Sequence, residues 1–211
     1  MLDFSEYLEP APAFCMGEQS MGVVWDSLVE TRDGDMPAGE IKPGTELLTS
    51  DGFEPVLENL LFTPRPSETR IINRGALGAL RGTLVSSQTQ LLLSHWALPQ
   101  LLGKSRVLLV ADQLPETHVQ QSNPQKGKEL LCQLITGRRV LISCDGLAIL
   151  TTCVAERFGN FPRDTAPRIS GSTSGVGSIP HLSKKGWLLL REIPGVFGKN
   201  ICSQNEVSDH G

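Results

Sequence analysis

Residues 27 to 56 read SLVETRDGDMPAGEIKPGTELLTSDGFEPV and alternate short apolar runs with turn residues. Val23 to Thr31 has the composition of a strand that ends at Asp33-Gly34, and Thr45 to Thr49 is another that ends at Asp51-Gly52. Between them, Ile41-Lys42-Pro43-Gly44 predicts a turn, because proline fixes its own backbone angle and glycine tolerates positive φ. This stretch therefore predicts a series of short antiparallel strands.

The same alternation of short apolar runs and turn residues continues through the middle of the chain. Short apolar runs predict strands at Phe53 to Phe62, Thr69 to Asn73, Thr83 to Ser86, Gln90 to Leu93 and Arg106 to Ala111. Two prolines make residues 64 to 69 a loop. A short helical turn is expected over His95 to Leu102, with Ser94 as its cap and Gly103 as its end. The expected fold class is mainly β.

The strongest hairpin signal lies between residues 130 and 144. Leu130 to Ile135 and Arg139 to Cys144 are apolar runs on either side of Thr136-Gly137, and Leu147 to Val154 extends the meander. Cys132 and Cys144 lie on either side of this turn, so they could face each other across the hairpin. Two buried thiols are the expected state, because cross-strand neighbours only sometimes meet the geometry of a disulfide, which stays an alternative.

Composition excludes several classes of protein. The 211 residues are 39% hydrophobic and 20% charged, so the chain can bury a core. A net charge of −4 gives no basic surface for nucleic acid or anionic lipid. No apolar run approaches the ~18 residues of a membrane span, and the acidic N-terminus does not read as a signal peptide. We expect a cytoplasmic or unconventionally secreted protein.

The chain divides into three parts by composition. Residues 1–19 form a leader without a clear hydrophobic period, and residues 20–160 form the β domain. Residues 161–211 form a small irregular extension: a flexible linker containing ISGSTSGVGS, an apolar docking segment at Trp187 to Leu190, and a polar tail.

Four phrases in order resemble the Hint (Hedgehog/intein) domain, particularly its short bacterial members. Residues 27–56 are similar to that family's opening "L-x-P-G-D-x-V-x-T-x-D-G" phrase. Gly75-Ala76-Leu77-Gly78 follows, and residues 84–93, LVSSQTQLLL, are similar to the family's "L-V-S-P-Q-H-R-V-L-L". Residues 130–158 are similar to its closing hairpin and the "N-G-L" turn after it. The resemblance implies a two-lobed horseshoe of antiparallel hairpins.

The resemblance also implies a self-processing reaction and shows where this chain departs from it. Family members begin with a Cys or Ser that attacks the preceding carbonyl, and a His in a T-x-x-H phrase protonates the departing nitrogen. Counting back five residues from Ser27 places the nucleophile at Gly22. The T-x-x-H phrase reads Ser86-Ser87-Gln88-Thr89, and two further family His positions align with Gln133 and Arg139.

We therefore expect a non-catalytic Hint-like scaffold or interaction module, whose vestigial cleft is lined by Gly22, Ser86, Thr89, Gln133 and Arg139. No catalytic residue or cofactor is expected. No metal is expected either, because the four histidines show no spacing suited to a metal. One alternative is an autoprocessing protein that uses Ser20 or Cys15 as nucleophile and His95 as proton donor. Another is a small-ligand binder that reuses the cleft. A protein partner is left open.

Overall fold

The structure is a computed structural model that describes residues 6–9, 21–121, 129–154, 179–193 and 195–197. The predicted linker 161–178 and the tail from residue 203 lie outside these residues. Within them the fold is mainly β, as expected, and most strand pairs are antiparallel. The pairs β10–β16 and β12–β15 are parallel.

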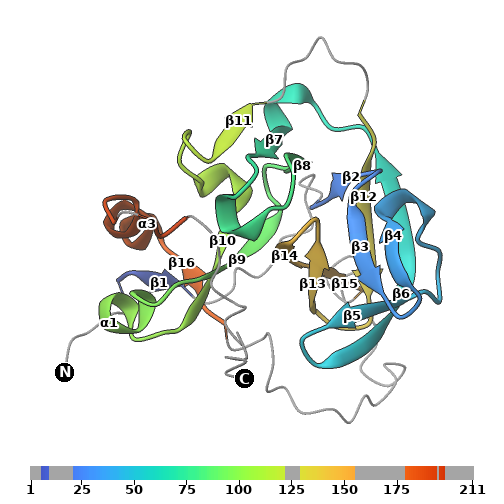
Figure 1. Cartoon of the computed structure of the whole chain (residues 1–211), viewed down its shortest axis with the longest axis horizontal. Helices are drawn as coiled ribbons and strands as arrows, with labels where there is room; N and C mark the ends of the chain where they lie inside the picture. Colours follow the sequence, from blue (N-terminus) through green and yellow to red (C-terminus); the bar gives the residue numbers. More distant parts are fainter. Residues whose placement is uncertain (1–5, 10–20, 122–128, 155–178, 194, 198–211) are drawn as a thin grey trace, which may run out of the picture.

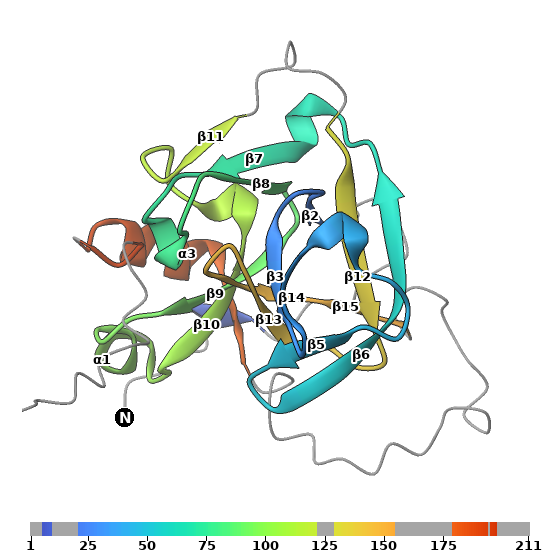
Figure 2. The same ribbon diagram turned by 45° about the vertical axis from the view of Figure 1, so that its right-hand side comes forward.

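Most of the strands form one hydrogen-bonded path in the order β1-β16-β10-β9-β14-β13-β3-β5-β6-β12-β2-β8-β7-β11, while β4 pairs with β3 and β15 pairs with β12 off this path. Figures 1 and 2 show β3 to β6 and β12 to β15 gathered on one side, and β9, β10, β16 and both labelled helices on the other. The bounds in the first half are β1 (Leu8–Glu9), β2 (Val23–Val24), β3 (Leu28–Thr31), β4 (Gly34–Pro37), β5 (Glu46–Thr49), β6 (Gly52–Phe62), β7 (Thr69–Ile72) and β8 (Thr83–Ser86). The second half contains β9 (Gln90–Ser94), α1 (Leu98–Leu102), β10 (Arg106–Val110), β11 (Val119–Gln121), β12 (Leu131–Thr136), β13 (Leu141–Cys144), β14 (Leu147–Leu150), β15 (Thr152–Cys153), β16 (His181–Leu182) and α3 (Lys184–Arg191).

Two copies of a T-x-D-G turn build the opening hairpins. In the first, the Thr31 hydroxyl donates to the carbonyl of Gly34 at 2.6 Å, and in the second Thr49 donates to Gly52 at 2.8 Å. Both glycines have positive φ, +105° and +111°, which a side chain would disfavour. The turns therefore join β3 to β4 and β5 to β6, as the D-G signals predicted.

The predicted strand Val23 to Thr31 is interrupted. Its first part is β2 and its last part is β3, because the Ser27 amide donates to the carbonyl of Val24 and turns the chain between them. Ser94 does not cap α1, which begins after Ala97, whereas Gly103 ends that helix in the left-handed conformation. The expectation for Gly103 is confirmed.

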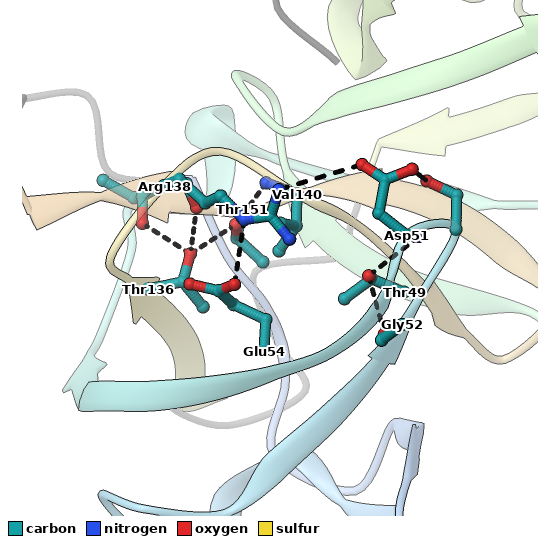
Figure 3. Close-up of polar contacts among 10 residues, drawn as sticks. Thr49, Asp51, Gly52, Glu54, Thr136, Arg138, Val140 and Thr151 are labelled. Atoms are coloured by element: carbon teal, nitrogen blue, oxygen red, sulfur yellow. Dashed lines mark hydrogen bonds and ion pairs between the residues drawn. The ribbon is translucent and has the colours of Figure 1, made fainter. Parts of the chain in front are cut away.

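The predicted hairpin between residues 130 and 144 is wrong. β12 pairs with β6, where Gln133 is opposite Leu60, and β13 pairs with β14, where Ile142 is opposite Ile149. Thr151 bonds to both ends of the segment that connects β12 to β13. Its hydroxyl contacts that of Thr136 at 2.7 Å and accepts from the amide of Val140 (Figure 3). Cys132 and Cys144 are accordingly free thiols in different ladders.

Segments from both ends of the sequence pack together against β10. β16 lies between β1 and β10, and α3 follows it with Ser183 as a side-chain N-cap. Leu190 of α3 is fully buried in the main core, and Trp187 packs against the same core. Part of the region expected to be an irregular extension is thus a strand and an amphipathic helix, and two residues of the expected leader form β1.

Candidate functional site

Gly22 and Thr89 meet at the start of β2. The Gly22 amide donates to the Thr89 hydroxyl at 3.1 Å, and that hydroxyl donates to the Gly22 carbonyl at 2.9 Å. Both residues are buried. They are 67 positions apart in the sequence. One neutral hydroxyl therefore bonds both backbone polar groups of the residue at which the sequence resemblance places the nucleophile.

Local turn chemistry places Thr89 at this point. β8 ends at Ser86, and the Thr89 amide donates to the Ser86 carbonyl at 3.0 Å. The Ser86 hydroxyl accepts from the amide of Gln88 at 3.1 Å, and the Ser86 amide donates to the carbonyl of Gly22 at 2.9 Å. Ser86 therefore reaches the site through its backbone, while its side chain closes the turn that carries Thr89.

The space beside Gly22 is already occupied. A Cβ atom built on Gly22 would lie 2.9 Å from a ring carbon of Phe62 and 3.0 Å from the carbonyl oxygen of Cys132. Any side chain at position 22 therefore requires the ring of Phe62 to move. This close packing gives a physical reason for glycine at that position.

A small pocket of about 20 Å³ opens next to this contact. Gly22, Thr89 and Gln133 line it, together with Met21, Val23, Cys132, Leu134, Ile142, Ile149, Leu150, Thr151 and Thr152. The Gln133 amide group donates to the Thr152 hydroxyl at 2.9 Å. A volume of this size is room for about one water molecule. The pocket is far smaller than the ~300 Å³ at which small-molecule sites begin.

Cys132 was not predicted as part of this site, although it lines the pocket. It lies opposite Val23 on β2, and its side chain is 1% exposed. Burial raises the pKa of its thiol to about 11. A thiol with that pKa stays protonated near neutral pH, so it is a poor nucleophile. Only the position of Cys132 beside Gln133 could have indicated its presence here.

Arg139 does not line the pocket, and its positive charge instead acts on His181 of β16. His181 is buried, and its pKa is lowered to about 4, first by burial and then by the positive charge of Arg139. The structure thus brings together Gly22, Thr89, Gln133 and the backbone of Ser86, and it separates Arg139 from them. Spacing along the chain could not reveal this, because Arg139 follows β12 by only a few residues.

The residues of the autoprocessing alternative fall elsewhere. Cys15 and Ser20 lie outside the described residues. The Nδ1 atom of His95 accepts from the amide of Ala97 at 3.2 Å, and its ring packs against Trp96 with centroids 5.3 Å apart. His95 therefore supports the start of α1, which Figures 1 and 2 show well apart from β2.

The described part of the chain contains no group of three His, Cys, Asp or Glu residues that could hold a metal ion. None of its helices combines the length and apolar character needed to cross a membrane.

Comparisons with known proteins give similarity to solved structures alone. No protein-family model matches the chain, and no curated protein does. The gp41-1 intein is similar with a TM-score of 0.41 and 13% sequence identity, over 63% of this chain and 98% of that one. The MchDnaB-1 intein has a TM-score of 0.40 and 14% identity, over 62% of this chain and 99% of its own. A bacterial intein-like domain from Clostridium thermocellum has a TM-score of 0.43 and 9% identity, over 64% of this chain and 100% of that domain.

Proposed function

We propose that this chain is a Hint-domain protein whose self-processing site is inactive and that it serves as a scaffold or interaction module. The four sequence phrases support the assignment to the Hint class. The observation that carries the loss of activity is the pair of hydrogen bonds between Thr89 and Gly22.

The acyl shift of this class needs a nucleophile at the scissile bond and a group that protonates the departing nitrogen. Gly22 has no side chain, and the Thr89 hydroxyl stays neutral across the physiological range. Cys132 lines the pocket, but its raised pKa keeps the sulfur protonated. The chemistry therefore has neither of its two reactive groups at this position.

The test is whether the purified full-length chain cleaves itself. We expect intact mass spectrometry to show one species, unchanged after incubation with dithiothreitol. A fragment that begins at Gly22 and accumulates faster in the thiol would overturn the inactive site. A fragment that begins at Cys15 or Ser20 and disappears on Ala substitution of that residue would favour the autoprocessing alternative.

A reactivated variant tests the Hint assignment itself. We expect the triple substitution Gly22→Cys, Phe62→Ala and Thr89→His to cleave after residue 21 when a thiol is added, because it restores both groups and removes the Phe62 ring from beside position 22. Gly22→Ala with Phe62→Ala and Thr89→His is the matched control without a nucleophile. A folded triple variant that never cleaves would count against the assignment.

A further inference from the structure

A second and larger cavity borders the same strands, β13 and β14. It is a groove of about 280 Å³ lined by Glu30, Leu48, Thr49, Ser50, Leu92, Arg106, Leu141, Ile142, Ser143, Gly146 and Ala148. Side chains alternate between the two faces of a strand. Ser143 and Ala148 therefore lie on the opposite face from Ile149, which lines the pocket beside Gly22, whereas Ile142 lines both cavities.

Strand register explains how these residues come together. Ser143 of β13 is opposite Ala148 of β14, and the pairing of Ile149 with Leu91 puts Leu92 of β9 next to Ala148. On the other side, the pairing of Cys144 with Val29 puts Glu30 of β3 next to Ser143. Directly opposed residues share a face. The groove is thus a row of side chains that crosses from β3 to β9 and on to β10.

The floor of the groove is apolar. Leu92 and Leu141 are 7% and 6% exposed, and Ala148 is half-buried. Leu48 is 39% exposed, which is high for a leucine beside a core. An apolar floor with one exposed leucine favours an occupant that carries an apolar side chain.

The two charged residues of the groove lack partners. Glu30 is half-buried and Arg106 is exposed, and neither takes part in an ion pair or a side-chain hydrogen bond in the described part of the chain. Arg32, the basic residue that directly follows β3, is instead paired with Glu46. An occupant that brings a cation to Glu30 and an anion to Arg106 therefore meets complementary charges at both.

The charges lie at opposite sides of the row. Glu30 is on β3 and Arg106 on β10, four strand spacings apart, which is ~19 Å between backbones. Both residues line the groove, and an extended peptide advances ~3.3 Å per residue. A segment of about four to six residues can therefore satisfy both charges while one of its apolar side chains lies on the floor.

We propose that this groove binds an extended peptide segment of a partner protein, with a basic residue paired to Glu30, an acidic residue paired to Arg106, and an apolar residue between them against Leu48, Leu92 and Leu141. The inference goes beyond the proposed function, because it gives an interaction module a specific surface away from the Gly22 pocket. It does not depend on whether the chain cleaves itself.

The test uses fluorescein-labelled hexapeptides with blocked ends. Each probe has Leu-Phe at its centre and Lys and Glu at its two ends, in both orders, and binding to the full chain is followed by fluorescence polarisation. We expect the probe with one of the two orders to bind, and Glu30→Gln to weaken the affinity for that probe about tenfold. The same substitution should not change the affinity of a probe whose Lys is replaced by Gln. Arg106→Gln should give the matching result for the Glu of the probe.

Arg32→Gln is the matched control, because it removes a charge directly after β3 that does not line the groove. Absence of binding by every probe, or equal losses in Arg32→Gln and Glu30→Gln, would overturn the proposal. Sedimentation of the chain without peptide measures its oligomeric state. A dimer that Glu30→Gln dissolves would assign the groove to a second copy and would also overturn it. Neither outcome affects the cleavage assay.

Discussion

At the scale of single residues, the bridging hydroxyl of Thr89 is the contact on which the inactive site depends. It satisfies the amide of Gly22, which has no other hydrogen-bond acceptor among the described residues, whereas the Gly22 carbonyl also accepts from Ser86. Loss of the hydroxyl would leave one buried donor unpaired. A buried polar group without a partner costs about 1 to 3 kcal/mol.

We therefore expect Thr89→Val to lower the free energy of unfolding by about 1 to 3 kcal/mol, measured by urea denaturation. Thr89→Ser, which keeps the hydroxyl, should lose less. Equal losses in the two variants would mean that the methyl group, and not the hydroxyl, stabilises the site.

His181 makes the free energy of unfolding sensitive to acid. Its Nε2 atom is buried without a partner among the described residues, Arg139 lies near, and Glu9 is its Cα neighbour on β1. The pKa is about 4 in the folded state and near 6.5 in the unfolded chain. The unfolded state therefore takes up a proton first as the pH falls.

The neutral form of His181 contributes its full stability above pH 6.5, and this is lost as the pH falls through 6.5 towards 4. We expect the free energy of unfolding to fall by up to about 1.4 kcal/mol per pH unit in that window. His181→Leu should remove this part of the slope, and Arg139→Gln should reduce it. An unchanged slope in His181→Leu would assign the acid sensitivity to other groups.

At the scale of secondary structure elements, α3 is held by a close backbone contact. A Cβ atom on Gly186 would lie 2.3 Å from the carbonyl oxygen of Tyr7, just before β1. The helix is also tied there by an ion pair of 3.0 Å between Lys185 and Glu6. Glycine at this position is what lets the helix approach the N-terminal segment.

We expect Gly186→Ala to lower the free energy of unfolding by about 1 to 3 kcal/mol, despite the ~1 kcal/mol that alanine gains over glycine inside a helix. Limited proteolysis should then cut near α3 sooner than in the native chain. Lys184→Ala, at an exposed position of the same helix, should change neither measurement. A more stable Gly186→Ala would mean that the contact with Tyr7 is not tight.

What the sequence predicts well is local. The T-x-D-G turns and the end of α1 at Gly103 follow from a few neighbouring residues that need positive φ or a side-chain bond. The pairing of β12 with β6 does not follow from neighbouring residues, because the residues that pair are 69 to 80 positions apart in the sequence. The meeting of Gly22 with Thr89 came from resemblance and not from spacing, and the presence of Cys132 there had no signal of its own.

At the scale of the whole molecule, Asp145 connects distant parts of the strand path. Its backbone has φ of +50°, and its buried carboxylate accepts from the amide of Leu28 at 3.0 Å and from the hydroxyl of Thr83 at 3.1 Å. Arg81 adds an ion pair at 2.9 Å. One residue therefore joins β3, β8 and the turn between β13 and β14.

We expect Asp145→Ala to lower the free energy of unfolding by about 3 kcal/mol. The substitution leaves buried donors unpaired and puts alanine in a left-handed backbone conformation. Asp145→Asn should lose less, because asparagine tolerates that conformation. Asp26→Ala, which removes the exposed partner of Arg81, should change stability by no more than about 0.5 kcal/mol. Equal effects of the two alanine variants in urea would contradict this role for Asp145.

The pairing of β1 with β16 has a mechanical consequence. The two strands are antiparallel, with Leu8 opposite Leu182, so the start of one lies beside the end of the other. A tension applied through the two ends of the polypeptide would load that ladder at one edge and open its bonds in succession. Such unzipping needs less force than shearing all the bonds at once. Under tension, β1 would peel away from β16 first, while the strands between β3 and β12 still carry none of the load.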